Sequence, residues 1–72
     1  MEKVKINGEF IKLDSLLKLA GLVYTGGQAK MEILDGNVSV NGEKCLMRGK
    51  KCRHGDIIEF DGAKIVVEQN DR

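Results

Sequence analysis

Four Asn-Gly or Asp-Gly pairs divide the chain into short segments, and they constrain its fold more than any other feature of the sequence. The pairs begin at Asn7, Asp35, Asn41 and Asp61, and the chain contains no proline. Asparagine, aspartate and glycine tolerate positive φ at low cost, so each pair predicts a tight turn. The segments between the turns must therefore form short strands and helices.

Several segments beside these turns are rich in strand-forming residues. Residues 4–6 and 9–11 flank the first Asn-Gly pair and predict a short hairpin. Residues 38–40 form an alternating strand that stops at the next Asn-Gly pair. Residues 57–60 and 64–68 flank the last Asp-Gly pair and predict a second hairpin, which closes the chain.

Between the two sets of strands, the spacing of apolar residues becomes that of helices. One face of a first helix carries apolar residues at i, i+3, i+4 and i+7, namely Leu13, Leu16, Leu17 and Ala20. Asp14 is the expected N-cap of this helix, and Gly21 is its expected end.

A second helix is expected to begin near Gly26 and to end at the Asp-Gly pair at position 35. Thr25 and Gln28 have capping-box spacing, in which the threonine oxygen accepts from an amide while the glutamine side chain reaches back. The core-facing residues of this helix would be Ala29 and Ile33. Together the segments predict an α+β fold, with two packed helices against a small, mostly antiparallel sheet.

The length of 72 residues suits a single domain, residues 1–72, with a small core and little room for a deep substrate pocket. No apolar run approaches the length that crosses a bilayer, and the charged N-terminus lacks an apolar signal core. Two cysteines are too few for a disulfide scaffold. We expect a cytoplasmic protein with reduced thiols, no membrane partner and no small-molecule substrate.

Positive charge is concentrated in one segment of the chain, residues 44–55. The segment holds no acidic residue and five basic ones, and the remaining seven basic residues stand against all 11 acidic residues of the chain. The segment thus carries +5 and the remainder −4, although the net charge is only +1. Such polarity favours an anionic partner, and the alternative is a lysine-rich solvated loop.

Metal binding and catalysis find little support in the sequence. Cys45, Cys52 and His54 are three possible zinc ligands, but their spacing is not a usual structural zinc pattern and the chain has no second histidine. The single histidine has no recognisable nucleophile partner, and no phosphate loop of the nucleotide-hydrolase type occurs. We expect no metal, no cofactor and no enzymatic activity.

Several motifs occur along the chain in a characteristic order. They are the Leu13-Asp14 pair that opens the first helix, the stretch from Thr25 to Lys30, the stretch from Asp35 to Gly42, and His54-Gly55-Asp56-Ile57-Ile58. In this order they resemble the S-four RNA-binding domain, also called the alpha-L motif. The chain is more similar still to the free-standing bacterial members of the YaaA and YbcJ type. Many members of the wider family carry Ser-Arg where this chain has Thr25-Gly26.

The resemblance implies a non-catalytic protein that binds structured RNA. Ribosomal RNA is the expected ligand, and transfer RNA is the alternative. It further implies a role in ribosome assembly or quality control, with a ribosomal or assembly-factor protein as a possible partner. These are expectations from the family and are independent of the composition.

The beginning of the second helix suits a phosphate group. Gly26 and Gly27 are poor helix residues, but free amides at a helix N-terminus bind phosphate, and glycine lets a sugar-phosphate chain approach. Lys30, one turn in, adds a point charge. The alternative is that the two glycines only permit a tight corner between the helices. The residues expected to contact RNA at this end are Thr25, Gly26, Gly27, Gln28 and Lys30.

The basic segment supplies the other expected contacts. Arginine can hold phosphate oxygens with its fork of donors, and lysine acts as a point charge. Asn41 could contact a phosphate or a 2′-hydroxyl, or could serve only as a turn residue. The expected contacts from this part of the chain are Asn41, Lys44, Arg48, Lys50, Lys51 and Arg53.

The aromatic residues narrow the type of RNA. Phe10 and Phe60 sit in strand patterns and are expected in the core, which leaves Tyr24 as the one aromatic able to stack on a base. Its expected place, however, is at the edge of the core, with its hydroxyl in water. Single-strand binders need several stacking aromatics, whereas readers of shape and phosphate do not. Structured RNA is therefore favoured.

Two other partners remain open at this point. The same basic face could dock an acidic protein surface, as in an assembly or replication adaptor, or it could bind double-stranded DNA. Retention of structured RNA during purification, and competition between RNA and DNA duplexes, would separate these alternatives.

Overall fold

The main sheet of the molecule has five strands, and in it the first strand of the chain pairs with the last. A computed structural model describes residues 1–70. The strand order is β1 (Glu2–Ile6), β7 (Ala63–Gln69), β6 (Ile57–Phe60), β3 (Val38–Val40) and β4 (Glu43–Lys44). β1 runs parallel to β7, and the other neighbours are antiparallel. The sheet is thus mostly antiparallel, as the sequence predicts.

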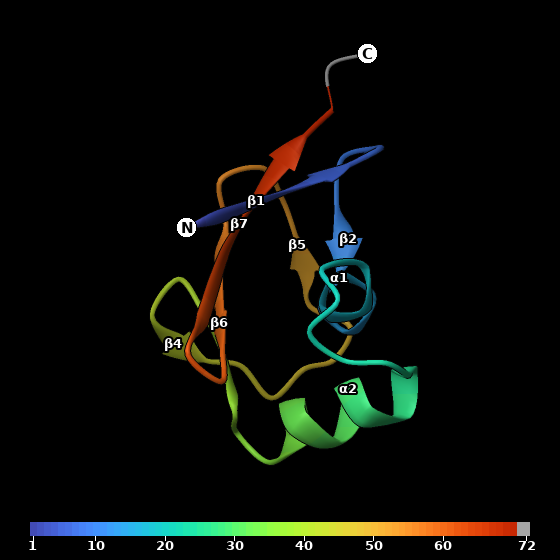
Figure 1. Cartoon of the computed structure of the whole chain (residues 1–72), viewed down its shortest axis with the longest axis vertical. Coiled ribbons are helices and arrows are strands. Elements are labelled where there is room, and N and C mark those ends of the chain that lie inside the picture. Colours follow the sequence, from blue (N-terminus) through green and yellow to red (C-terminus); the bar gives the residue numbers. More distant parts are fainter. Residues whose placement is uncertain (71–72) are drawn as a thin grey trace.

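A second, two-stranded sheet and two helices complete the fold (Figure 1). β2 (Ile11–Lys12) pairs antiparallel with β5 (Lys51–Cys52). Helix α1 (Leu13–Leu19) follows β2 directly and packs against both β5 and α2 (Gly26–Leu34). The expected α+β class is therefore confirmed. Within residues 1–70, neither helix has the length and apolar character needed to traverse a bilayer.

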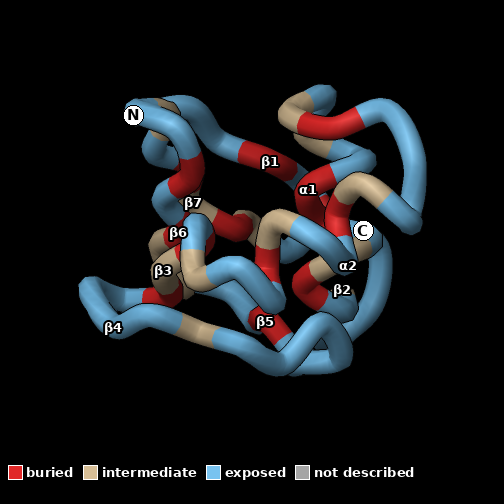
Figure 2. The backbone as a smooth tube through the Cα atoms, turned by 90° about the horizontal axis from the view of Figure 1, so that it is seen from below, coloured by how far each residue is buried: buried red, intermediate tan, exposed pale blue. Residues whose placement is uncertain are grey.

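The core lies between the main sheet and the helices. Figure 2 shows buried stretches of the helices and strands meeting inside the molecule, with exposed stretches around them. The predicted core residues Leu13, Leu16, Leu17, Ala29 and Ile33 are fully buried. They pack with the inward side chains of the sheet, which are Val4, Ile6, Val38, Val40, Ile58, Phe60, Ile65 and Val67.

The predicted hairpin of residues 4–6 and 9–11 is wrong. β1 pairs with β7, more than sixty residues away along the chain, and the residues after the first Asn-Gly pair continue to the other sheet. The turn is nevertheless present, with Gly8 at φ 108°. The partner differs because pairing with β7 buries Val4 and Ile6 in the core, which a local hairpin cannot do.

The start of α1 also differs from the prediction. Asp14 lies in the first turn, and Lys12 occupies the N-cap position without a side-chain cap. Two backbone carbonyls from the basic segment take the place of the cap. The amide of Leu13 donates to the Lys50 oxygen at 2.9 Å, and that of Asp14 donates to the Arg48 oxygen at 3.1 Å. The helix ends as predicted at Gly21, which has φ 76°.

Helix α2 begins and ends close to the predicted positions. The Thr25 hydroxyl oxygen accepts a hydrogen bond from the Gln28 amide at 3.0 Å, so the predicted cap is confirmed. The Gln28 side chain reaches back one residue further than expected and accepts from the Tyr24 amide at 2.9 Å. Gly36 ends the helix with φ 82°, and its amide donates to the Ile33 carbonyl.

Asn41 and Asp56 join two turns that are far apart in the sequence. The Asn41 side-chain nitrogen donates to an Asp56 carboxylate oxygen at 3.0 Å, and its side-chain oxygen accepts from the Ile57 amide at 2.9 Å. The second Asp56 oxygen accepts from the Arg53 amide at 2.8 Å. These contacts give a structural reason for the Asn-Gly and Gly-Asp motifs, because they fix the start of β6 against the end of β3.

Cys52 is the inward-facing residue of β5 and is fully buried. Burial raises the pKa of its thiol from 9.0 to about 11, and the carboxylate of Asp56 adds to the shift. The thiol therefore stays protonated in the folded protein at neutral pH and acts as a small apolar core residue.

The turn at Asn41 yields a stability prediction. Asn41 and Asp61 share a positive φ, at 53° and 52°, so replacing either by alanine strains the backbone by about 1–2 kcal/mol. Asn41→Ala also removes two side-chain hydrogen bonds, so we expect it to lower the free energy of unfolding by about 1–3 kcal/mol more than Asp61→Ala does. Urea denaturation of both variants measures the difference, and equal losses would contradict the bridging role of Asn41.

Cys52 yields a prediction of pH dependence. The unfolded thiol ionises near its ordinary pKa of 9.0, whereas the folded thiol ionises near 11. The folded state thus binds more protons between these values, and stability falls as pH rises from about 9 to 11 by roughly 2–3 kcal/mol. Urea denaturation of wild type and Cys52→Ala at pH 8 and pH 11 measures this, because the variant lacks the Cys52 contribution. An equal fall in both proteins would refute the assignment.

Candidate functional site

The outer face of the β2–β5 sheet carries positive side chains. Alternation along the two strands turns Ile11 and Cys52 toward the core. Lys12 and Lys51 are direct cross-strand partners, and both are exposed. Two like charges placed opposite each other on a sheet destabilise it. This arrangement is favourable only where something else, such as a bound anion, offsets the repulsion.

Phe10 lies beside these lysines and does not lie in the core, so that expectation is wrong. Its side chain is 38% exposed. The Lys51 ammonium lies 4.8 Å from the centre of its ring, and the Arg53 guanidinium lies 5.6 Å from it. Both distances are typical of cation–π contacts. Phe60, in contrast, is buried as expected.

The five cations of the basic segment are not neutralised by carboxylates. Within residues 1–70, the one ion pair closer than 4.0 Å joins Lys64 to Glu59, on β7 and β6. All five cations of the basic segment are exposed: Lys44, Arg48, Lys50, Lys51 and Arg53. Nearby carboxylates would screen the positive field of these cations. Because none forms an ion pair with them in the described residues, the field remains available to an external anion.

The loop between β4 and β5 borders a shallow groove of about 300 Å³. Three expected contact residues line it together, namely Asn41, Lys44 and Lys50. The carbonyls of Arg48 and Lys50 bind the start of α1, so the backbone of this loop is held while its charged side chains point outward. Asn41 uses its side-chain oxygen and one donor within the fold, which gives it a structural role at the rim of the groove.

Lys44 lies at the far end of α2 from the two glycines. Its side chain covers Gly36, where an added Cβ would come within 3.1 Å of the lysine Cδ. A helix of nine residues is about 13 Å long. Because its side chain lies at the C-terminal end of α2, the ammonium group of Lys44 also interacts favourably with the negative end of the helix dipole.

The first turn of α2 is exposed at Thr25, Gly26 and Gly27, and Gln28 is half-buried there. A Cβ added at Gly26 would meet no atom within 4 Å, and one at Gly27 would meet only the Thr25 hydroxyl at 3.9 Å. Neither glycine has a positive φ. Space and backbone geometry therefore do not require glycine here, which removes the main argument for the tight-corner alternative.

Tyr24, just before this turn, is 92% exposed. Its expected place at the edge of the core is therefore wrong, and its whole ring is accessible for stacking. Lys30 is exposed one turn further along α2.

The expected site residues thus form three groups. The β2–β5 face holds Lys51 and Arg53, the groove holds Asn41, Lys44 and Lys50, and the first half of α2 holds Thr25 to Lys30. Arg48 connects the first two groups through the loop. Helix α1 contacts both β5, which carries part of the first group, and α2, which carries the third.

Sequence reasoning missed Lys12 and Phe10. Lys12 lies outside the basic segment in the sequence. It comes to lie beside Lys51 of that segment only through the pairing of β2 with β5. Phe10 follows an alternating pattern that indicates a buried strand residue. The local signal for an outward phenylalanine was Lys12, which lies two residues later and so on the same side of an extended strand.

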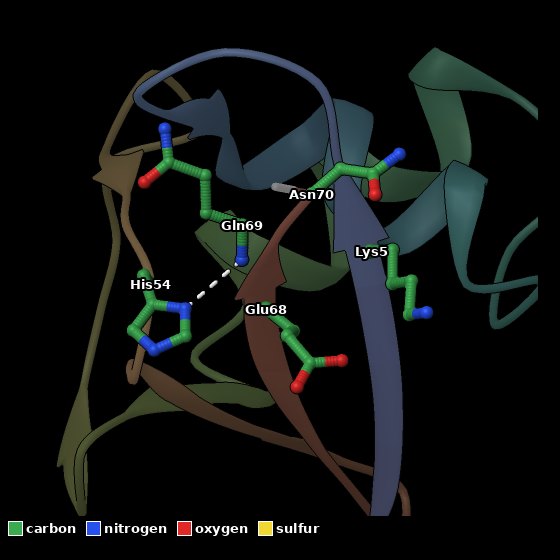
Figure 3. A pocket seen from close by; sticks show the side chains of 5 residues that line it. All are labelled: Lys5, His54, Glu68, Gln69 and Asn70. Atoms are coloured by element: carbon green, nitrogen blue, oxygen red, sulfur yellow. Dashed lines mark hydrogen bonds between the residues drawn. The ribbon is translucent and has the colours of Figure 1, made fainter. Parts of the chain in front are cut away.

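A separate polar pocket of about 440 Å³ lies at the ends of β1 and β7 (Figure 3). It is lined by Lys5, His54, Glu68, Gln69 and Asn70, none of which was expected to contact RNA. Nδ1 of His54 accepts a hydrogen bond from the Gln69 amide at 2.9 Å. This bond places the histidine ring against β7.

The three possible zinc ligands are engaged in separate contacts. The Cys45 and Cys52 thiols donate to the carbonyls of Met47 and Lys50, both at 3.7 Å, while His54 binds Gln69. Across residues 1–70, no group of three or more His, Cys, Asp or Glu side chains is placed to hold a metal ion.

Comparison with known proteins agrees with this architecture. The family described as "S4 domain" matches residues 4–68. The chain is also similar to a "Probable ribosome maturation protein RlbA" from Bacillus subtilis (strain 168), with 39% identity over 59 residues. That match covers 82% of this chain and 83% of the Bacillus protein. The motifs, the fold and the matched span together show that the chain belongs to the S4 domain family.

Proposed function

We propose that the chain is a non-catalytic protein of the cytoplasm that binds structured RNA through its backbone phosphates. Family membership supports an RNA-binding role. The observation that carries the proposal is the set of five exposed cations between Lys44 and Arg53, which have no carboxylate within 4.0 Å in residues 1–70. Such a surface suits a polyanion.

Ribosomal RNA is the favoured ligand, and ribosome assembly or quality control is the favoured process. The name of the Bacillus relative places that protein in ribosome maturation. A ribosomal protein or assembly factor is the proposed protein partner. The exposed aromatics are only Phe10 and Tyr24, which supports a reader of shape and phosphate over a binder of single strands.

The N-terminus of α2 is the second part of the proposed interface. The side chain of Thr25 caps the Gln28 amide, which leaves the amides of the two glycines directed out of the helix toward an incoming phosphate. Lys30 lies one turn away and adds positive charge.

A protein-interaction adaptor remains the second candidate, and one observation favours it. Leu46 and Met47 are 52% and 67% exposed within the basic loop, and methionine and arginine are enriched at protein interfaces. The direct test is a gel shift with ribosomal and transfer RNA fragments at low salt. A concentration-dependent shift supports RNA binding, and no shift with any of them would favour the adaptor.

The salt dependence of binding tests the phosphate contacts. Neutralising about five phosphates gives a slope of log K against log salt of roughly −3.5 to −4.5. We expect Lys50→Glu/Lys51→Glu to weaken binding on the order of 10- to 100-fold for all structured RNAs alike, and to flatten the slope by at least about 1.4. The matched control is Lys3→Glu/Lys5→Glu, which changes the net charge equally at two exposed positions of β1 in the main sheet. An equal loss in both variants would mean that only net charge matters.

The two glycines of α2 provide a test in which stability and binding change in opposite directions. Alanine fits at both positions, so Gly26→Ala/Gly27→Ala should raise the free energy of unfolding by about 0.4–1 kcal/mol per site. The same methyl groups would obstruct a phosphate at the helix amides, so RNA affinity should fall several-fold. Thermal melts and binding titrations measure both effects. Unchanged affinity in the stabilised variant would remove this helix end from the interface.

A further inference from the structure

At the outer face of the β2–β5 sheet, two cations lie against one aromatic ring, that of Phe10. Strand alternation puts Phe10 on the same side as Lys12, and Arg53 on the same side as Lys51. The two cation–π distances, 4.8 Å and 5.6 Å, show that Lys51 and Arg53 both lie against the ring. Phe10 is thus shared by two cations that come from the other strand.

This arrangement counters the repulsion among neighbouring positive charges. Lys12 and Lys51 are cross-strand partners, and no carboxylate within residues 1–70 lies within 4.0 Å of either. Free lysine and arginine side chains in this position would move apart and sample many rotamers. The negative face of an aromatic ring attracts cations without neutralising them. The ring therefore holds the charges close together and leaves their hydrogen-bond donors free.

We propose that Phe10 is a positioning residue for RNA binding, whose ring holds the Lys51 ammonium and the Arg53 guanidinium together so that both engage phosphates of one RNA backbone. This inference rests on the proposed function and adds to it. Phe10 acts through the two cations and does not stack on a base. Its energetic effect is the ordering of two flexible side chains before RNA arrives, which lowers the entropic cost of binding.

A thermodynamic cycle tests the proposal. Binding of a ribosomal RNA hairpin would be titrated with wild type, Phe10→Leu, Lys51→Gln/Arg53→Gln and the triple variant. Phe10→Leu should weaken binding about three- to tenfold in the wild-type background, since two exposed cation–π contacts are lost. In the Lys51→Gln/Arg53→Gln background the same change should have an effect of less than about twofold, because nothing remains for the ring to position.

Three further variants separate positioning from structural support. Phe10→Tyr and Phe10→Trp keep a ring face and should retain affinity within about twofold of wild type. Leu19→Ala removes an apolar side chain on α1 that is 56% exposed and is not among the expected RNA contacts, and should leave affinity unchanged. In proton NMR spectra of the free protein, the ring-current shifts of the Lys51 and Arg53 side-chain protons should disappear in Phe10→Leu and persist in Phe10→Tyr.

The possible outcomes are distinct. An equal loss of affinity on Phe10→Leu in both backgrounds would show direct stacking on RNA and overturn the positioning role. Full affinity of Phe10→Leu, with normal binding by wild type, would overturn it as well and leave the proposed function intact. Absence of RNA binding by wild type would overturn both.

Discussion

Two backbone hydrogen bonds hold the basic segment in place, and the candidate RNA interface depends on them. The amides of Leu13 and Asp14 at the start of α1 donate to the carbonyls of Lys50 and Arg48. A helix N-terminus has unsatisfied donors and needs acceptors, which side chains usually supply. Here a distant loop supplies them, so the helix and the loop stabilise each other.

The charged residues that form an ion pair and those of the basic segment lie on different parts of the surface. The chain is almost neutral overall, at +1, yet the acidic residues lie outside the segment from Lys44 to Gly55. The one short ion pair in residues 1–70 lies on the main sheet, between Lys64 and Glu59. Exposed pairs of this kind stabilise a protein little. Stability therefore comes mainly from the apolar core. Because the fold does not depend on surface ion pairs, it tolerates a basic face whose cations have no carboxylate partners.

The Asn41–Asp56 contact gives one part of the family motifs a structural role. These motifs carry the resemblance to the S-four domain, but their side chains mainly bind each other and the adjacent backbone. They place β6 and the turn after Arg53, and in this way they support the end of the basic segment. The glycines that open α2 have no such structural requirement, which makes them the more informative part of the sequence about ligand binding.

Local chemistry in the sequence was enough to predict both helices, the β6–β7 hairpin, the Thr25 cap and the class of fold. Each of these depends on residues within a few positions of one another, where capping, turn propensity and apolar period act directly. Sequence reasoning erred on the partner of β1, on the cap of α1 and on the exposure of Phe10 and Tyr24, because each depends on contacts with distant residues. The basic segment could be identified from the sequence. That Lys12 and Phe10 lie beside it depends on the pairing of β2 with β5. Strand pairing between distant segments follows from which arrangement buries the most apolar surface, and only the folded chain as a whole determines that.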